Sequence, residues 1–478
     1  MRQRGAPDDR DVTVVDGTLS PRLERRLTDA ARWPEANTPR RLRRFARLVA
    51  ALTLALATVG AGALTAAGIT ALGIQQRTVP AIVGMERIHA WLSDADRSAA
   101  NAYLAGGSEV TLPELQYQAD IAAASRELQN ASEHDPGGGD TSERLQRIAV
   151  LVDQYQSLVQ TANVEDRLGV SVGTVYLQAG TGLMHRSGSG ILAQVDALQG
   201  LYADDLDRAN LTLWVAQWLL PAYLGLAVVL AGLLVATQVF VRRRFRRRRN
   251  PQLLAATLLL LLAASASGMG ATQARQSVSA AEDQSYSRLL NLWNARALLY
   301  DANGNESLSL IAADQASRAA ADEAFQAETR QLVDRPLTDG LVEAAARGDV
   351  RFGGLLADEL RAAGAGPERD AAVRVLRLYQ RFMEIDAGVR AKAAQGAAAD
   401  AIALALGTDQ GQLTFAFADV DWYLGLAIQR LQGQFDDGMT YAELLIGGTA
   451  LVEVLVLAIV ALTNWGLGAR FKEFRAGR

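Results

Sequence analysis

The sequence predicts an all-α membrane protein with four membrane-spanning helices and two tandem helical bundles outside the membrane. Three observations lead to this prediction. Ala, Leu, Gln, Arg and Glu, which favour helices, dominate outside the apolar stretches, and strand-favouring runs are rare. Four apolar stretches approach or exceed the roughly 20 residues that a helix needs to cross a bilayer. Each half of the 478-residue chain has the order span, outer segment, span.

The four apolar stretches define the predicted organisation of the chain. In order, the segments are a basic tail (1–47), the first span (48–74), an outer bundle (75–210), the second span (211–241), an Arg-rich loop (242–252), the third span (253–270), a second outer bundle (271–443), the fourth span (444–467) and a C-terminal tail (468–478). About 47 residues precede the first span, which is long for a signal peptide and favours a retained anchor.

Basic residues set the predicted orientation in the membrane. Twelve Arg precede the first span, and seven Arg lie within residues 242–249. With the C-terminal tail, these segments hold 23 of the 48 basic residues and only eight acidic ones. Because Lys and Arg concentrate in cytoplasmic segments, we expect a multi-pass plasma-membrane protein with both termini in the cytoplasm and acidic outer domains.

A weak internal repeat favours a tandem duplication. Residues 92–105 align with residues 299–312. The identical positions are Leu92, Asp94, Ala95 and Ala105, matched by Leu299, Asp301, Ala302 and Ala312. A second match surrounds Tyr155 and Tyr379, with apolar positions stepping by three and four as on one helix face. Short matches also arise by chance in Ala-rich helices, but the shared order and topology favour duplication.

Each outer segment is predicted to fold as an antiparallel bundle of about four helices. Breaks between helices are expected at 106–107, 135–140 and 187–190 in the first bundle, and at Gly304, 335–340 and 364–367 in the second. The last helix of each bundle is expected to run directly into the following span. Such a helix would transmit a small axial shift or rotation across the membrane.

No catalytic, metal-binding or nucleotide-binding motif is present. The chain has no Cys, and its three His residues, His89, His134 and His185, are widely separated, which favours helix-surface roles. No H-E-x-x-H, P-loop, dinucleotide fingerprint or nucleophile elbow occurs. The glycine-rich runs at 137–139 and 187–190 follow no predicted strand. We therefore expect a protein that is not an enzyme, with no cofactor, no metal and no nucleic-acid partner.

Four polar residues in the repeated stretch are candidate contacts for a ligand or partner: Asp94, Arg97, Asp301 and Asn303. The alternative is that they form a solvated helix face, which is the commoner role of such residues in amphipathic helices.

Two residues of the predicted spans are candidates for intramembrane coupling. Glu453 lies in the fourth span, where a carboxylate costs about 2.5–3.5 kcal/mol, so it should face other helices. It either takes part in signalling or serves as a polar contact that joins two spans. Pro221 is predicted to kink the second span, and a structural kink is the simpler interpretation. Small residues at four-residue spacing in the first and third spans fit packing within the chain and homodimerisation equally well.

The span–bundle–span unit resembles the input module of bacterial chemoreceptors and sensor kinases with four-helix-bundle sensor domains, but the chain lacks a HAMP domain and any output domain. In topology, paired outer domains, length and Arg/Ala-rich composition, the chain resembles the actinobacterial GlnX-type four-span membrane proteins. This resemblance rests on no sharp motif and transfers no functional residue. It implies a GlnH-like solute-binding lipoprotein outside, a PknG-like Ser/Thr kinase inside, and an acidic amino acid as the signal.

The expected function is therefore a non-enzymatic transmembrane signal transducer. Large outer domains, helical links to the spans and short cytoplasmic segments motivate this expectation. The main alternative is a structural or scaffold protein of the cell envelope. A transporter is disfavoured, because spans with little polarity beyond Glu453 offer no evident substrate path.

Overall fold

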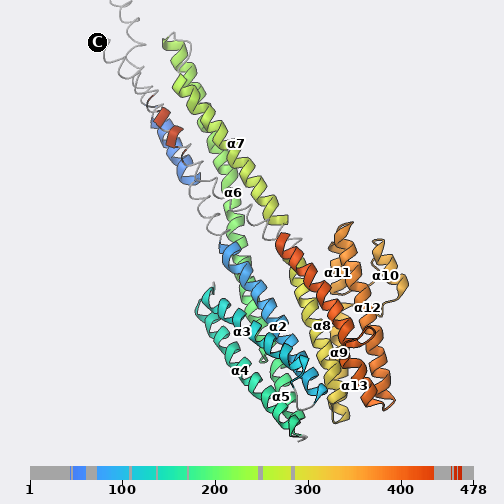
Figure 1. The fold of residues 1–478 in the computed structure, drawn as a ribbon. Helices are drawn as coiled ribbons and strands as arrows, with labels where there is room; N and C mark the ends of the chain where they lie inside the picture. Colours follow the sequence, from blue (N-terminus) through green and yellow to red (C-terminus); the bar gives the residue numbers. More distant parts are fainter. Residues whose placement is uncertain are drawn as a thin grey trace, which may run out of the picture. The chain divides into compact units, whose positions relative to one another are not determined.

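All the regular secondary structure that the structure describes is helical. The structure, a computed structural model, describes residues 44, 47–60, 73–106, 110–135, 138–168, 172–245, 251–280 and 286–434, and eight residues between 454 and 465. Within these ranges the regular elements are all helices, which confirms the predicted all-α fold class (Figure 1).

The chain divides into two compact units. One comprises residues 1–64, 217–270 and 448–478, and therefore holds most of the predicted spans. The other comprises residues 65–216 and 271–447, and holds both predicted outer bundles.

The first unit contains helix 47–60, the C-terminal part of α6 (Ile191–Phe245) and the N-terminal part of α7 (Pro251–Ala280). Its core is apolar and includes Leu56, Leu230 and Leu260, each with 1% exposure or less. Gln238 of α6 donates to the Leu253 carbonyl of α7 at 2.9 Å and to the Thr257 hydroxyl at 2.8 Å. These polar contacts join the two helices next to the loop between them.

Among the described residues, one helical segment, Pro221–Phe240, is long and apolar enough to cross a membrane. Arg47–Gly60 and Pro251–Ser265 are apolar but shorter. Residues 61–72 and most of the fourth predicted span, with Glu453, lie outside the described residues, so the arrangement of four spans stays a prediction. Pro221 lies inside α6, which is helical on both sides of it.

The first bundle begins with α2 (Val79–Ala105), preceded by the π-turn η1 (Ile74–Thr78), and continues with α3 (Leu112–Glu133), α4 (Gly139–Arg167), α5 (Gly173–His185) and the start of α6. Gly106 ends α2 with φ +60°, a conformation that favours glycine. Thr111 then caps α3, since its hydroxyl accepts from the Glu114 amide at 3.3 Å. All three predicted breaks are confirmed, but the break between α4 and α5 was not predicted.

Helices α5 and α6 together form the fourth helix of the first bundle. Later residues of α5 and α6 contact earlier residues of α2, so both helices run antiparallel to it. The successive pairs are Tyr103–Gly173, Asp96–His185, His89–Asp196 and Glu86–Gln199. The break at 187–190 therefore interrupts one helix of a four-helix bundle and does not add a fifth layer.

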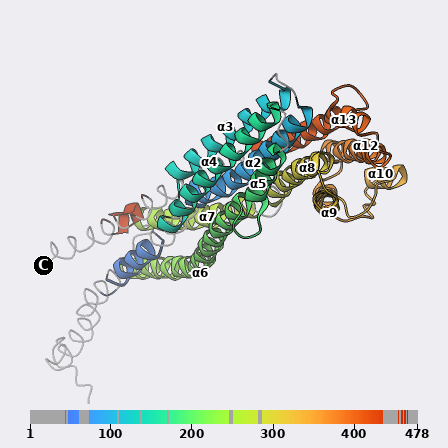
Figure 2. The ribbon, with the colours of Figure 1, turned by 90° about the horizontal axis from the view of Figure 1, so that it is seen from below.

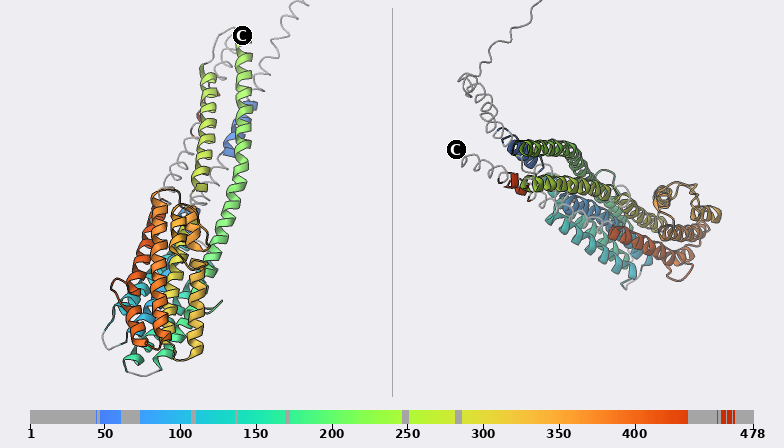
Figure 3. Two further views of the ribbon diagram at one scale, coloured as in Figure 1. Left: turned by 90° about the vertical axis from the view of Figure 1, so that its right-hand side faces the viewer. Right: turned by 90° about the horizontal axis from the view of Figure 1, so that it is seen from above.

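The second bundle repeats this order, with two short helices inserted. It consists of α8 (Ser287–Ile311), α9 (Gln315–Leu332), α10 (Asp339–Ala346), α11 (Leu355–Ala362), α12 (Pro367–Ala394), α13 (Ala398–Leu406) and helix 413–434 (Figure 3). Helices α8, α9 and α12 take the order of α2, α3 and α4, and α13 precedes the last helix as α5 precedes α6. Helices α10 and α11 have no counterpart in the first bundle.

The predicted break at Gly304 is wrong. Gly304 is buried in the interior of α8, and a Cβ atom there would lie only 3.3 Å from the Cα of Arg97 on α2. The missing side chain serves close packing of two helices and not a turn. The predicted breaks at 335–340 and 364–367 are confirmed.

Candidate functional site: the polar interface between the bundles

The two bundles meet along α2 and α8. Helix α2 lies between α3 of its own bundle and α8 of the other (Figure 2). Arg296 lies 5.9 Å from the Trp91 ring, Gly304 lies against Arg97, and Ser307 bonds Asn101. The residue numbers of the contacting pairs increase together along both helices, so α2 and α8 run parallel.

Equivalent positions of the internal repeat face each other at this interface. The alignment of Leu92 with Leu299 makes Gly304 the counterpart of Arg97, and these two residues are in direct contact. Two repeated units that meet through the same face are related by an approximate two-fold axis, as in a symmetric dimer. The pairing of a large residue with glycine lets the helices approach closely, and the geometry supports the predicted duplication.

Buried polar side chains line both helices at this contact, and we call them the polar interface. On α2 they are Asp94, Asp96, Arg97, Ser98 and Asn101, and on α8 they are Asn303, Glu306 and Ser307, all 9% exposed or less. Three of the four candidate residues, Asp94, Arg97 and Asn303, thus lie inside the protein. The fourth, Asp301, is partly buried. The alternative of a solvated helix face is wrong for the three buried residues, because that face of each helix packs against the other bundle.

Arg97 is the centre of the polar interface. Its Nε donates to Asp94 Oδ1 at 2.7 Å, and its Nη2 donates to Ser98 Oγ at 3.1 Å. Its guanidinium lies over the Phe417 ring of the second bundle, 4.5 Å from the centroid. The cation is therefore neutralised by its own bundle and stacked on an aromatic ring of the other. Burial raises the pKa of Asp94, and the charge of Arg97 opposes that rise.

Amide and hydroxyl groups join the helices one turn beyond Arg97. Asn101 Nδ2 donates to Asn303 Oδ1 at 3.4 Å, and the Ser307 hydroxyl donates to Asn101 Oδ1. Asn303 Nδ2 donates to Glu306 Oε2 at 3.3 Å. Burial, and then the nearby Asp386, raise the pKa of Glu306 well above its usual value. Polar partners thus join the two helices beside the apolar side chains that both bundles contribute to one hydrophobic core.

A second polar cluster surrounds Asp96. Tyr155 donates to Asp96 Oδ1 at 2.9 Å, and His185 Nε2 lies 3.2 Å from Asp96 Oδ2. Burial lowers the pKa of His185, but the hydrogen bond with Asp96 and the charge of Asp301 outweigh it and raise the pKa to about 9. Burial and the charge of Asp301 raise the pKa of Glu328 to about 8.

His134 and His185 are exposed and His89 is partly exposed, in keeping with helix-surface roles, although two of the three have carboxylate partners. His185 bonds Asp96, and His89 Nδ1 lies 2.8 Å from Asp196 Oδ1. Within the described residues, no three His, Asp or Glu side chains come together in a way that would hold a metal ion.

An ion pair in the second bundle completes the interface. Arg296 on α8 binds both oxygens of Asp421 at 2.6 and 3.0 Å, and the Tyr300 hydroxyl donates to Asp421 Oδ1 at 2.6 Å. Sequence reasoning missed Asp96, His185 and this pair, because none of them belongs to a recognisable motif. The signal available was the presence of Trp293 and Tyr300 about one helical turn before and after Arg296, on the same face of the helix.

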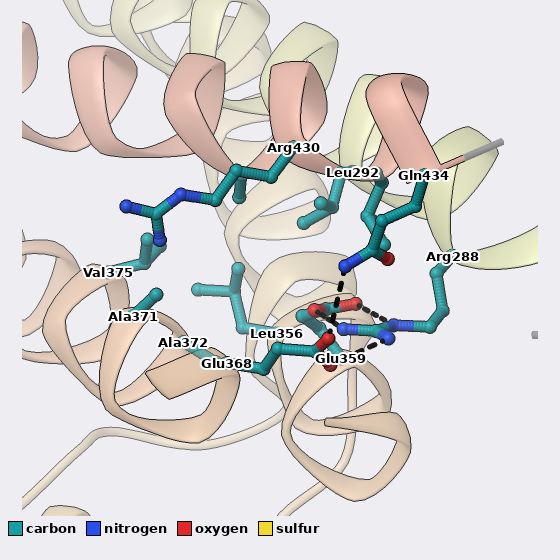
Figure 4. A pocket seen from close by; sticks show the side chains of 12 residues that line it. Arg288, Leu292, Leu356, Glu359, Glu368, Ala371, Ala372, Val375, Arg430 and Gln434 are labelled. Carbon is teal, nitrogen blue, oxygen red and sulfur yellow. Dashed lines mark hydrogen bonds and ion pairs between the residues drawn. The ribbon is translucent and has the colours of Figure 1, made fainter. Parts of the chain in front are cut away.

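Two cavities lie at the end of the bundles where the chain enters from η1 and α7. A cavity of about 400 Å³ is lined by residues of η1, α2 and α3, including Arg77, Arg87 and Glu127, and by Leu289 and Gln432 of the second bundle. A smaller cavity of about 60 Å³ lies in the second bundle. There Arg288 bonds Glu359 at 2.7 Å and Glu368 at 3.1 Å, and Gln434 reaches the same Glu368 (Figure 4).

Replacing Gly304 with leucine is expected to destabilise the contact between α2 and α8. The added side chain would meet the Arg97 backbone, and overpacking of this kind costs about 1–3 kcal/mol. Thermal unfolding of the full chain in nanodiscs, followed by circular dichroism, measures the effect. Gly200→Leu is the control, since no atom lies within 4 Å of a Cβ at that helical glycine. Equal melting temperatures for the two variants would contradict the close contact.

The first bundle is similar to a known family of domains. Residues 70–210 match the model of a family described as an actinobacterial sensor domain. The match covers α2 to α5 and the first part of α6, which is the first bundle with half of the polar interface. Comparisons with curated proteins and with solved structures gave no significant match. A sensing or signalling role therefore rests on the family of the first bundle.

Proposed function

We propose that the protein is a non-enzymatic transmembrane signal transducer. It relays an extracytoplasmic solute signal, an amino acid delivered by a binding lipoprotein, to a cytoplasmic partner such as a Ser/Thr kinase. The sensor-domain match over residues 70–210 supports the sensing role. The Arg-rich segments support the orientation, with both termini in the cytoplasm and both bundles outside.

Helix α6 is the observation that carries the proposal. It runs without interruption from Ile191 to Phe245, a length of about 80 Å at 1.5 Å per residue. Its first part bonds α2 through Asp196 and Gln199, and its later part contains the membrane-crossing segment Pro221–Phe240. A displacement of the first bundle would therefore act on the span without an intervening hinge loop.

The polar interface supplies the part that changes state. Hydrogen-bonded pairs such as Asn101–Asn303 accept alternative partners when two helices slide, whereas close-packed apolar side chains resist sliding. A ligand or partner shifts such an equilibrium only by the difference in its affinity for the two arrangements. Binding that favours one register of α2 against α8 would thus be transmitted through α6.

An envelope scaffold is the second candidate function, because the buried hydrogen bonds between the bundles and the ion pairs within each would suit a rigid support as well. The two functions differ in what they require of the cytoplasmic segments. A transducer needs them to contact its partner, whereas a scaffold that acts outside the membrane does not.

Deletion of residues 468–478 is expected to abolish the response of the cell's Ser/Thr phosphorylation to added glutamate or aspartate, and deletion of the whole chain is expected to do the same. Quantitative phosphoproteomics before and after addition of the amino acid measures this response. An immunoblot of membrane fractions controls for the amount of protein. A wild-type response both in the truncated strain and in the strain that lacks the whole chain would favour the scaffold.

A further inference from the structure

Six large apolar side chains are more than half exposed at one end of the first bundle. We call them the apolar tip, and they are Val110, Leu112, Leu115, Val164, Leu168 and Val175. Leu112 and Leu168 are the most exposed, at 74% and 70%. Outside the predicted spans, only Val150 and Trp422 among the described residues match this exposure. Exposed apolar residues concentrated in this way mark binding surfaces.

The six residues share one end of the bundle because three helices begin or end there. Helix α3 begins at Leu112, α4 ends at Arg167 and α5 begins at Gly173 (Figure 1). Arg167 Nη2 bonds Glu114 Oε2 at 2.7 Å, which joins the end of α4 to the start of α3. Gly173 packs against Tyr103 near the end of α2, which places the start of α5 beside it.

The apolar tip is not a general property of bundle ends. The corresponding end of the second bundle, where α8 and α12 end and α9 and α13 begin, carries no large apolar side chain of comparable exposure within the described residues. Since the two bundles share one helix order, the difference indicates a role of the first bundle alone.

We propose that the apolar tip is a docking surface for an extracytoplasmic protein that presents an apolar patch with a basic rim. This proposal rests on the orientation given under the proposed function. Helix α2 starts a few residues after the first predicted span and ends at the tip, 27 residues or about 40 Å further on. The tip therefore lies at the end of α2 that is farther along the chain from the first predicted span.

The geometry also disfavours a second copy of the chain. Copies in one membrane point in the same direction, so their tips cannot meet end to end. The charges next to the tip select the partner's chemistry. Beside the tip lie three acidic residues, Glu114, Glu165 and Asp166, and one cation, Arg167. The net charge of this rim is negative, and a basic partner would complement it.

Single cysteines test the surface, because the chain has none of its own. Leu112→Cys and Val175→Cys are compared with Val150→Cys, which is 56% exposed on α4 away from the tip. Each variant is labelled with a membrane-impermeant maleimide in intact cells and as full chain in nanodiscs. We expect labelling of the two tip cysteines to be at least about fivefold slower in cells, and labelling of the control to be equally fast in both.

Three results of the labelling would overturn different claims. Equal rates in cells and nanodiscs at the tip would refute docking and leave the orientation intact. Labelling of all three variants only after permeabilisation would refute the orientation, and with it the proposed function. A disulfide that links two copies of the Leu112→Cys variant would replace the partner protein with a second copy, and so overturn the proposal.

The partner is then identified with a benzophenone maleimide on the same cysteines and purified. Its affinity for the full chain in nanodiscs is expected to fall about tenfold or more for Leu168→Asp, since an apolar anchor is lost at the contact. Val150→Asp should bind with wild-type affinity. Equal affinities for the two variants would show that the captured protein does not bind at the tip, and would refute the proposal.

Discussion

Replacing Arg97 with methionine is expected to lower the free energy of unfolding by about 3–5 kcal/mol, the cost of breaking a buried ion pair from one side. Asp94 would lose its bonded cation at 4% exposure, and Ser98 would lose its donor. The stacking on Phe417 would be lost as well. In a unit of this size such a change lowers the apparent melting temperature by about 10 °C. Thermal unfolding of the full chain in nanodiscs measures it.

Two further variants separate the ion pair from general damage. Arg347→Met removes an exposed pair with Glu343 and should change the free energy of unfolding by less than about 1 kcal/mol. Asp94→Asn combined with Arg97→Met should recover part of the loss, because the unpaired carboxylate is gone. If Arg97→Met melts within about 2 °C of the wild type, the ion pair of Arg97 with Asp94 contributes little to the stability of the polar interface.

The helices of the bundles could be predicted because their boundaries are local. Gly106 and Thr111 end one helix and begin the next through their own backbone and side chain, whatever the rest of the chain does. The break after α4 was missed although Gly169 follows Leu168 in the sequence, because an isolated glycine also occurs inside helices. Gly304 misled in the opposite direction, since a glycine used for helix packing and a glycine used for a turn look alike in the sequence.

The candidate residues could be found from the repeat, but their surroundings could not. Asp94 and Arg97 stood out as polar positions in a repeated stretch, and polarity on a helix ordinarily indicates solvent. Phe417, which covers the guanidinium, lies 320 residues further along the chain. No local pattern predicts a contact at that separation. Burial of these residues follows from the contact between the bundles, which the sequence predicted only as two separate domains.

The repeat also explains why the interface is polar and asymmetric. Two copies of one face would place like residues opposite each other, and two arginines at the crossing point would repel. With glycine at the position of the second arginine, one cation crosses the axis to the aromatic residues of the other half. A single chain can hold such an asymmetric contact, whereas a symmetric homodimer of one repeat cannot.

The free energy of unfolding of the unit that holds both bundles is expected to fall as pH rises from about 5 to 9. Glu328, with its pKa at about 8, and Asp120, which burial and the charge of Asp94 also raise to a pKa of about 8, hold protons in the folded chain that the unfolded chain releases near pH 4. The contribution of these protons to the free energy of unfolding is complete below pH 4 and is lost as pH rises through 8. His185 acts in the same direction, since its pKa of about 9 exceeds the unfolded value of 6.5.

Glu328→Gln tests this pH dependence directly. Each such proton contributes a slope of up to about 1.4 kcal/mol per pH unit, so removing one should flatten the fall of the apparent melting temperature between about pH 5.5 and 8. The amide keeps the neutral character that burial favours, and the variant should therefore melt above the wild type at about pH 8.5. Glu323→Gln, at an exposed position of the same helix, should keep the wild-type slope. An unchanged slope in Glu328→Gln would show that Glu328 does not hold this proton, and Asp120→Asn would then be expected to flatten the curve instead.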